Sequence, residues 1–256
     1  MSEKLQKILA NMGMGSRREI EQWIADGRVK VNGQVAKLGD RAEPEQRIFV
    51  DGRPVSQKKK PAHRVILYNK PTGQICSRRD PEGRPTIFSK LPKLKHQRWI
   101  AIGRLDFNTS GLLLLTTDGE LANRLMHPSF QIEREYAVRI LGEVTDEKLQ
   151  AMRDGVLLED GVARFSDIQK AKAADMDDEH ANQWYYVVLM EGRNREVRRL
   201  WESQGLTVSR LKRVRFGNLF IPSAVRAGRW TDLEPAQIRD LYKSVGLRRA
   251  SRERRD

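Results

Sequence analysis

Asp106 is prominent among the residues whose type and setting could support chemistry. The apolar segment 99–102 (WIAI) precedes it, and the polar run 108–111 (NTSG) follows it. A carboxylate at the end of a strand can act as a nucleophile or as a general base. An aspartate in this setting also commonly caps a turn by bonding to nearby backbone. Taken alone, Asp106 therefore leaves a catalytic and a structural interpretation open.

Other familiar kinds of site are missing from the sequence. No phosphate-binding loop ends in Gly-Lys-Ser/Thr, and residues 13–15 (GMG) lie between two predicted helices rather than after a strand. The four histidines are scattered without metal-ligand spacing. The acidic run 175–179 (DMDDE) lacks the glycine and terminal glutamate of a calcium loop, so we interpret it as a solvated loop. We expect no metal, nucleotide or other cofactor.

The charge of the chain predicts a polyanionic partner. The 256 residues carry a net charge of +14, divided as +6 over residues 1–64, −1 over residues 65–190 and +9 over residues 191–256. A charge of this size favours nucleic acid through the release of counterions. Random surface scatter is the alternative, but two basic ends around a near-neutral middle favour two RNA-facing surfaces.

Cysteine usage and hydropathy indicate where the chain works. Cys76 is the only cysteine, which excludes an internal disulfide framework and fits a reducing compartment. No apolar run approaches the roughly 20 residues that cross a bilayer, and the first residues show no apolar core of a signal peptide. We expect a cytoplasmic monomer that does not contact a membrane.

The first 55 residues predict two helices followed by short strands. Apolar residues at helical spacing end at Gly13 and Gly15, and residues 16–19 (SRRE) form a capping-box pattern that opens a second helix. Residues 29–31 (VKV) alternate like a strand and lead into Asn32-Gly33, a strong hairpin signal. A second tight turn is predicted at Asp51-Gly52.

This module resembles the RNA-binding domain named after ribosomal small-subunit protein four, also called the alpha-L motif. The resemblance lies in residues 3–7 (EKLQK), 15–19 (GSRRE) and 27–33 (GRVKVNG). Arg17 and Arg18 stand at the N-terminal turn of the second helix, where the helix dipole disfavours cations. That local cost suggests contacts with RNA phosphates.

The rest of the chain mixes strand-like and helix-like segments without regular alternation. Strands are expected near residues 65–68, 99–102, 112–115, 135–140 and 184–190, and helices near residues 121–126, 197–205 and 235–245. The pattern predicts an α+β fold with a mixed, largely antiparallel sheet. We expect an RNA-binding domain over residues 1–60, a larger domain over residues 61–246 and a basic tail over residues 247–256, with the lysines at 58–60 in the linker.

Four motifs of the larger domain resemble those of pseudouridine synthases, in the family order. Residues 103–115 (GRLDFNTSGLLLL) resemble the active-site motif, and residues 70–73 (KPTG) the first motif. Residues 134–138 (REYAV) resemble the tyrosine-bearing motif, and residues 191–200 (EGRNREVRRL) the basic one. Together with the N-terminal domain, the resemblance covers nearly the whole chain. It implies an isomerase that turns a uridine of RNA into pseudouridine without a cofactor.

The resemblance also implies roles for particular residues. Asp106 would be the carboxylate that acts at the ribose or at the base, two possibilities that remain open. Arg198 would pair with Asp106 and hold it ionised, and Tyr136 would pack on the extruded base. As structural alternatives, Tyr136 would be a packing residue and Arg198 a phosphate-binding surface residue. Contacts to RNA are expected from Arg17, Arg18, Arg28, Lys30, Lys70, Arg104, Arg193, Arg195 and Arg199.

The branch of this family with the same N-terminal domain acts on ribosomal RNA. Its small-subunit and other large-subunit enzymes more often carry an aromatic-His-Gln run where this chain has Asn194-Arg195-Glu196. That departure favours the type-B large-subunit enzymes and leaves the roles of these three positions open. We therefore expect ribosomal RNA of the large subunit, or its assembly precursor, as the partner. A non-catalytic ribosome-assembly protein would explain residues 1–55 but not the run 103–115, and no cofactor loop supports a methyltransferase.

Overall fold

The computed structural model describes residues 2–55, 62–78, 80–95, 97–171 and 183–248. Contacts divide the chain into two units, each treated by itself below. The first comprises residues 1–64, 92–100 and 117–119, and the second comprises residues 65–91, 101–116 and 120–256. The expected linker at residues 58–60, the acidic run 175–179 and the basic tail beyond residue 248 lie outside the described residues.

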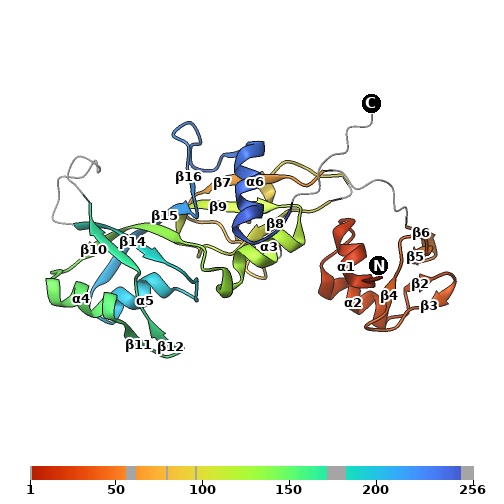
Figure 1. Ribbon diagram of the computed structural model, residues 1–256, viewed down its shortest axis with the longest axis horizontal. Coiled ribbons are helices and arrows are strands. Elements are labelled where there is room, and N and C mark those ends of the chain that lie inside the picture. The colour runs from red at the N-terminus through yellow and green to blue at the C-terminus, as the bar shows by residue number, and fades with distance from the viewer. Residues whose placement is uncertain (1, 56–61, 79, 96, 172–182, 249–256) are drawn as a thin grey trace. The chain divides into compact units, whose positions relative to one another are not determined.

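The first unit begins with two helices on a small antiparallel sheet (Figure 1). Its helix α2 starts where predicted, because the Ser16 hydroxyl accepts from the Glu19 N–H while the Glu19 carboxylate accepts from the Ser16 N–H. The sheet order is β3-β2-β5-β6, and β1 pairs with β4. The elements are β1 (Glu3–Lys4), α1 (Leu5–Asn11), α2 (Arg17–Ala25), β2 (Val29–Val31), β3 (Gln34–Val35), β4 (Arg41–Ala42), β5 (Ile48–Val50) and β6 (Arg53–Pro54).

The two predicted hairpin turns of this unit are confirmed by their backbone angles. Asn32 and Gly33 have φ of 50° and 89°, and Asp51 and Gly52 have φ of 49° and 75°. Two consecutive left-handed residues give the turn a twist that matches the flanking strands. The core beneath is made by apolar side chains from both helices and from β2 and β5, among them Leu9, Ile24 and Ile48.

The second unit is built on a nine-stranded sheet. Its mixed, largely antiparallel character is as the sequence predicted, but β13, β15, β16 and β17 were not among the expected strands. The strands follow the order β13-β14-β10-β15-β9-β7-β17, with β16 paired to β15 and β8 to β9. Along this path β9 and β15 run parallel and the other pairs are antiparallel. The strands are β7 (Val65–Lys70), β8 (Ile100–Ile102), β9 (Ser110–Thr116), β10 (Arg134–Leu141), β13 (Asp167–Lys170), β14 (Gln183–Leu189), β15 (Thr207–Phe216), β16 (Leu219–Phe220) and β17 (Trp230–Asp232).

Helices and a separate ribbon flank this sheet. Figure 1 shows α4 and α5 on the same side of β10 and β14, where the Trp201 ring of α5 lies 5.3 Å from the Tyr185 ring of β14. Helix α4 and the ribbon β11–β12 were not predicted, although Thr145 as a cap and Asp160-Gly161 as a turn signal were available. The elements are η1 (Ile87–Lys90), α3 (Gly119–Met126), η2 (Pro128–Phe130), α4 (Asp146–Asp154), β11 (Val156–Leu158), β12 (Gly161–Ala163), α5 (Glu196–Glu202) and α6 (Pro235–Ser244).

Strands β9 and β15 approach each other unusually closely at Gly111. Gly111 has φ of 105°, and a Cβ atom placed on it would overlap the carbonyl oxygen of Arg213. Only glycine combines this backbone angle with so close an approach. The start of β9, and the loop that leads into it, is thereby fixed against β15.

Within the described residues, no helix is both long enough and apolar enough to cross a membrane.

Candidate active site

Asp106 lies on the loop between β8 and β9. The loop is anchored by buried Leu105, while Phe107 is exposed and Asp106 itself is half-buried. The Thr109 N–H donates to the Asp106 carbonyl over 3.0 Å, which closes a tight turn. The Asp106 carboxylate therefore stands on a short, folded loop rather than on a free strand end.

The four carbonyl oxygens of residues 106–109 in this loop each accept a hydrogen bond from another part of the chain. Lys70 Nζ donates to Asp106 O over 3.0 Å and to Thr109 O over 2.8 Å. The Gly73 N–H donates to Phe107 O over 2.9 Å, and Arg198 Nη2 donates to Asn108 O over 3.2 Å. Two other motifs of the resemblance, at residues 70–73 and 191–200, thus hold the active-site motif in place.

Lys70 is a structural cation in this arrangement. Its side chain is fully buried, and its ammonium donates to three carbonyl oxygens, the third being Pro71 O at 3.0 Å. Burial lowers the pKa of Lys70, and the nearby Cys76 and Asp106 oppose that effect. The expected contact of Lys70 with RNA is not supported by this geometry, because all three ammonium hydrogens are used inside the protein.

Cys76 supports the same loop from the other side. Its Sγ lies 3.4 Å from Leu105 O and 3.5 Å from the Leu105 N–H, directly before Asp106. Burial, the largest effect, raises the pKa of the Cys76 thiol. A neutral, buried thiol behaves as a small packing group.

Tyr136 is brought near the start of β9 by the register of β15. Arg213 of β15 is the Cα partner of Tyr136 on one side and of Gly111 on the other. The Tyr136 side chain is buried, and Arg213 is buried too, with its Nε donating to Leu112 O over 2.7 Å. An aromatic ring and the loop that bears Asp106 are therefore placed on neighbouring parts of one sheet.

Arg198 reaches the loop from helix α5. Its Nη1 donates to Val208 O over 2.7 Å, and its Nη2 makes the bond to Asn108 O. Burial lowers the pKa of Arg198, and the charge of Asp106 opposes that effect. The hydrogen bonds of Arg198 thus differ from the expected direct pairing: the guanidinium binds the backbone of the loop, and its charge acts on Asp106 at longer range.

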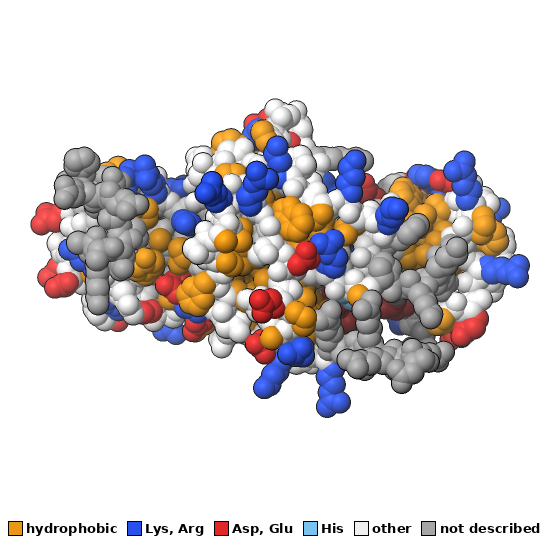
Figure 2. Space-filling model, turned by 90° about the horizontal axis from the view of Figure 1, so that it is seen from above, with side chains coloured by type: hydrophobic (Ala, Val, Ile, Leu, Met, Phe, Trp, Pro, Cys, Tyr) orange, Lys and Arg blue, Asp and Glu red, His pale blue; other side chains and the backbone are white. Residues whose placement is uncertain are grey.

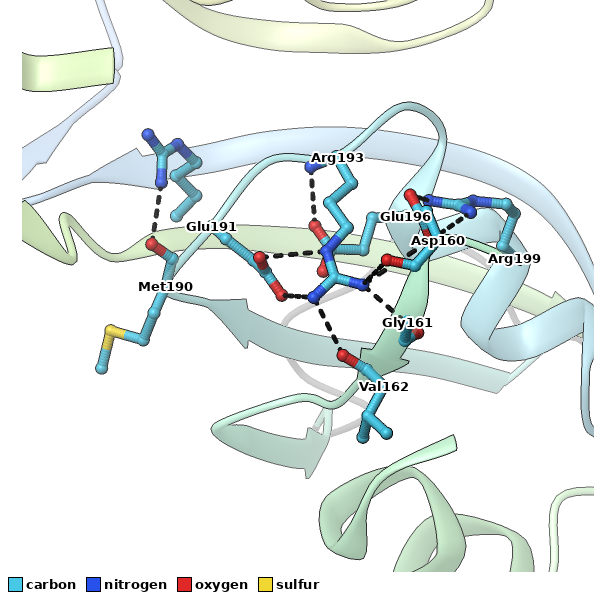
Figure 3. Close-up of polar contacts among 9 residues, drawn as sticks. Asp160, Gly161, Val162, Met190, Glu191, Arg193, Glu196 and Arg199 are labelled. Carbon is cyan, nitrogen blue, oxygen red and sulfur yellow. Dashed lines mark hydrogen bonds and ion pairs between the residues drawn. The ribbon is translucent and has the colours of Figure 1, made fainter. Parts of the chain in front are cut away.

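Arg193 is bound to a network of carboxylate and carbonyl groups (Figure 3). Its guanidinium bonds to both oxygens of Glu191, at 3.0 Å from Nε and 2.9 Å from Nη2. It also donates to the carbonyls of Asp160, Gly161 and Val162 in the turn and second strand of the ribbon, over 3.3, 3.3 and 2.9 Å. Its role as an RNA contact is not supported by this geometry, because its donors are occupied.

Arg199 is held in the same network. Its two Nη atoms donate to the two carboxylate oxygens of Asp160 over 2.8 and 2.9 Å, a bidentate pair that orients both side chains. An RNA phosphate would have to displace Asp160 to bind Arg199. Arg193 in the turn before α5 and Arg199 in α5 thus both bind the ribbon β11–β12.

The remaining basic candidates differ in how available they are. Arg28 bonds to both oxygens of Asp51, over 2.7 and 2.6 Å, and lies over the Trp23 ring at 5.1 Å. In the face shown in Figure 2, blue Lys and Arg side chains stand among orange hydrophobic patches. Besides Arg28, which is exposed but paired, the exposed candidates are Arg17, Arg18, Lys30, Arg104 and Arg195, the last with an ion pair to Glu202.

Several residues that shape the site were not found from the sequence. Arg213 and Asp160 act through partners far away in the chain, so their own neighbours gave no signal. Glu191 binds Arg193, two residues further on, but carboxylate and guanidinium groups at that spacing mark no particular site. Asp160 had one usable cue, since Asp160-Gly161 is a turn dipeptide. Glu196 is buried at the start of α5, where burial and the nearby Glu191 raise its pKa to about 7.

Known proteins match both units of the chain. The family model of RNA pseudouridylate synthase matches residues 64–203, and the S4 domain matches residues 3–48. A crystal structure of a pseudouridylate synthase superposes with a TM-score of 0.63 at 26% identity, covering 93% of this chain and 99% of that one. The expected α+β architecture with its N-terminal RNA-binding domain is thereby confirmed.

Two curated relatives carry the name ribosomal large subunit pseudouridine synthase B. The protein from Pseudomonas aeruginosa is 58% identical over 97% of this chain, which spans 64% of that relative's length. The protein from Escherichia coli K12 is 57% identical over 96% of this chain, which spans 84% of that relative. The family model matches more than half of the residues, and the two relatives are 58% and 57% identical to this chain. The loop of Asp106 lies within the matched residues. The chain therefore belongs to the RNA pseudouridylate synthase family.

Proposed function

We propose that this chain converts a uridine of large-subunit ribosomal RNA into pseudouridine during ribosome biogenesis in the cytoplasm. The reaction breaks the bond between ribose C1′ and uracil N1 and forms a bond between C1′ and C5. The C5 proton leaves and N1 gains a proton, so the change is an isomerisation and no oxidant or reductant is needed. The names of the curated relatives supply the large-subunit assignment.

The observation that carries this proposal is the fixed loop around Asp106. Lys70, Gly73 and Arg198 donate to its four carbonyl oxygens, so the carboxylate is preorganised before substrate arrives. Preorganised groups accelerate a reaction because no reorganisation is needed at the transition state. Asp106 acts as the nucleophile or base.

The roles of Tyr136 and Arg198 are inferred from where these residues lie relative to the Asp106 loop. Tyr136 packs against the extruded uracil, and Arg198 orients the Asp106 loop. The target base must leave its stack, which costs a few kcal/mol. Phosphate contacts from Arg17, Arg18, Lys30, Arg104 and Arg195 offset that cost. Residues 1–60 form the RNA-binding part, residues 61–246 the catalytic part and residues 247–256 a basic tail, and the protein acts as a monomer.

Substitution of Asp106 by asparagine tests the catalytic assignment. Asparagine keeps the shape and can cap a turn, but it cannot act as a carboxylate. We expect Asp106→Asn to fold and bind RNA while tritium release from RNA labelled at uracil C5 falls to background. The matched control is Asp167→Asn, an exposed aspartate of β13. Substantial release by a folded Asp106→Asn protein, judged by a thermal melt, would refute the assignment.

A further inference from the structure

Glu196 is a buried carboxyl group at the start of α5, two residues before Arg198. Only 2% of the residue is exposed. Its Oε2 accepts the Arg193 backbone N–H over 2.9 Å, and its Oε1 is buried without a donor to accept from. The Glu191 carboxyl group is within hydrogen-bonding reach. Two carboxyl groups can bond to each other only if one of them carries a proton.

The neighbouring charges place that proton on Glu196. The Arg193 guanidinium donates to both oxygens of Glu191, which leaves Glu191 as the acceptor and Glu196 as the donor of the pair. The remaining cations that face Glu196 are Arg199 of α5 and Arg134 of β10. Each is engaged elsewhere.

Arg199 is held by Asp160 of the β11–β12 turn. Arg134 donates to the carbonyls of Ile132, Met190 and Leu125. Glu196 thus has no ion-pair partner of its own among the described residues. Burial, followed by Glu191, raises its pKa to about 7.

The neutral carboxyl group of Glu196, at the end of the turn 191–196, stabilises this turn through hydrogen bonds to residues nearer its start. With the proton on Glu196, its hydroxyl can donate to Glu191, while its other oxygen accepts from the Arg193 N–H. The same turn is fastened to the ribbon β11–β12 by the guanidinium of Arg193 (Figure 3). The first residue of α5 is therefore anchored against a rigid support. Ionisation of Glu196 would place a buried anion beside the carboxyl group of Glu191 and weaken this anchor.

The position of α5 decides whether Arg198 reaches the loop of Asp106. Arg198 makes its two bonds in different directions, to Val208 O on β15 and to Asn108 O on the loop. The bond to Asn108 is the longer, at 3.2 Å. A shift of a few tenths of an ångström at the start of the helix would break it.

We propose that Glu196 is a positioning residue for the isomerisation, and that its protonated carboxyl group holds the start of α5 where Arg198 can grip the Asp106 loop. This role rests on the proposed function. Glu196 thereby has a role that the sequence alone left open.

The experiment compares wild-type protein with Glu196→Gln across pH 6 to 8. Glutamine reproduces the neutral carboxyl group, since its amide donates to Glu191 and its oxygen accepts from Arg193. With a pKa of about 7, about one tenth of Glu196 stays protonated at pH 8. We therefore expect the wild-type rate at saturating RNA to fall about tenfold relative to Glu196→Gln between pH 6 and 8, with KM unchanged. The matched control, Glu202→Gln on the exposed side of α5, should parallel wild type.

Thermal melts of the protein without RNA form a second arm. The pKa of Glu196 in the folded chain lies above its ordinary value of 4.5, so the folded state binds the additional proton. The stability linked to that proton is complete below pH 4.5 and is lost as pH rises through about 7. The wild-type melting temperature should therefore fall relative to Glu196→Gln between pH 5 and 8.

Three results would overturn the role of Glu196. They are parallel rate profiles of wild type and Glu196→Gln, a Glu196→Gln protein that is folded but inactive at pH 6, and one that does not fold at pH 6. If wild-type protein releases no tritium from ribosomal RNA at any pH, the proposed function itself fails. Diverging melts would in that case limit Glu196 to a contribution to stability.

Discussion

Replacement of the buried Lys70 tests how firmly the Asp106 loop is held. Lys70→Met keeps the length and apolar stem of the side chain and removes the ammonium. Pro71 O and Thr109 O then lose the donors that lie 3.0 and 2.8 Å away, while Asp106 O keeps the Thr109 N–H. The change leaves these two carbonyl groups without the Lys70 donor and removes the hydrogen bonds that join Lys70 to the loop.

The expected loss follows from those two groups. Each buried acceptor left without a partner costs about 1–3 kcal/mol, and relief from burying a charge offsets part of the sum. We expect a net loss of about 3 kcal/mol, which lowers the melting temperature of a chain of this size by about 6–12 °C. Tritium release should fall as well, because the loop that carries Asp106 loses its preorganisation.

Differential scanning calorimetry and single-turnover tritium release measure the two effects. Lys212→Met is the matched control, since Lys212 lies exposed on β15 and surface substitutions change stability by about 0.5 kcal/mol or less. A Lys70→Met protein that melts within about 2 °C of wild type and turns over normally would refute the clamping role.

Three further predictions concern the sheet, the RNA and the absence of a cofactor. Gly111→Ala should lower stability by about 3 kcal/mol or more in a denaturant titration, because its Cβ would overlap the carbonyl of Arg213. Gly205 also has a positive φ, of 70°, but a Cβ atom there would enter open space, so Gly205→Ala should cost less. Arg17→Ala combined with Arg18→Ala should reduce the slope of log affinity against log salt by up to about 2 in filter binding, since each phosphate contact contributes about 0.9; an unchanged slope would count against both contacts. Turnover should survive dialysis against a chelator, because the described residues include no group of three metal-ligating side chains. If activity is lost on dialysis and a divalent ion restores it while the RNA stays folded, the prediction of metal-independent turnover is wrong.

Local structure was largely predictable because its causes are local. The capping box at Ser16 and the hairpin turns at Asn32-Gly33 and Asp51-Gly52 depend on residues at most three apart, and all are found where expected. The buried run of β9 followed from its continuous leucines. The ribbon β11–β12 was missed because its strands are only three residues long and show weak alternation.

The candidate site was predictable in its residue types and only partly in its contacts. The motif around Asp106 could be found in the sequence because its order is contiguous. The partners of Arg198 could not, since Asn108 lies 90 positions away and offers a backbone carbonyl, which every residue type possesses. The burial of Lys70 was hidden for the same reason: its three acceptors are main-chain atoms, and no sequence pattern marks them.

The sequence by itself determined the family, the fold class and the charge that attracts RNA, because each is written in residue types and their spacing. Only the tertiary structure decided which cations remain available. Arg28 is paired with Asp51, and Arg199 with Asp160, across 23 and 39 positions of the chain. A guanidinium binds whichever acceptor the fold places nearest, so its availability is a property of three-dimensional packing and not of the motif that contains it.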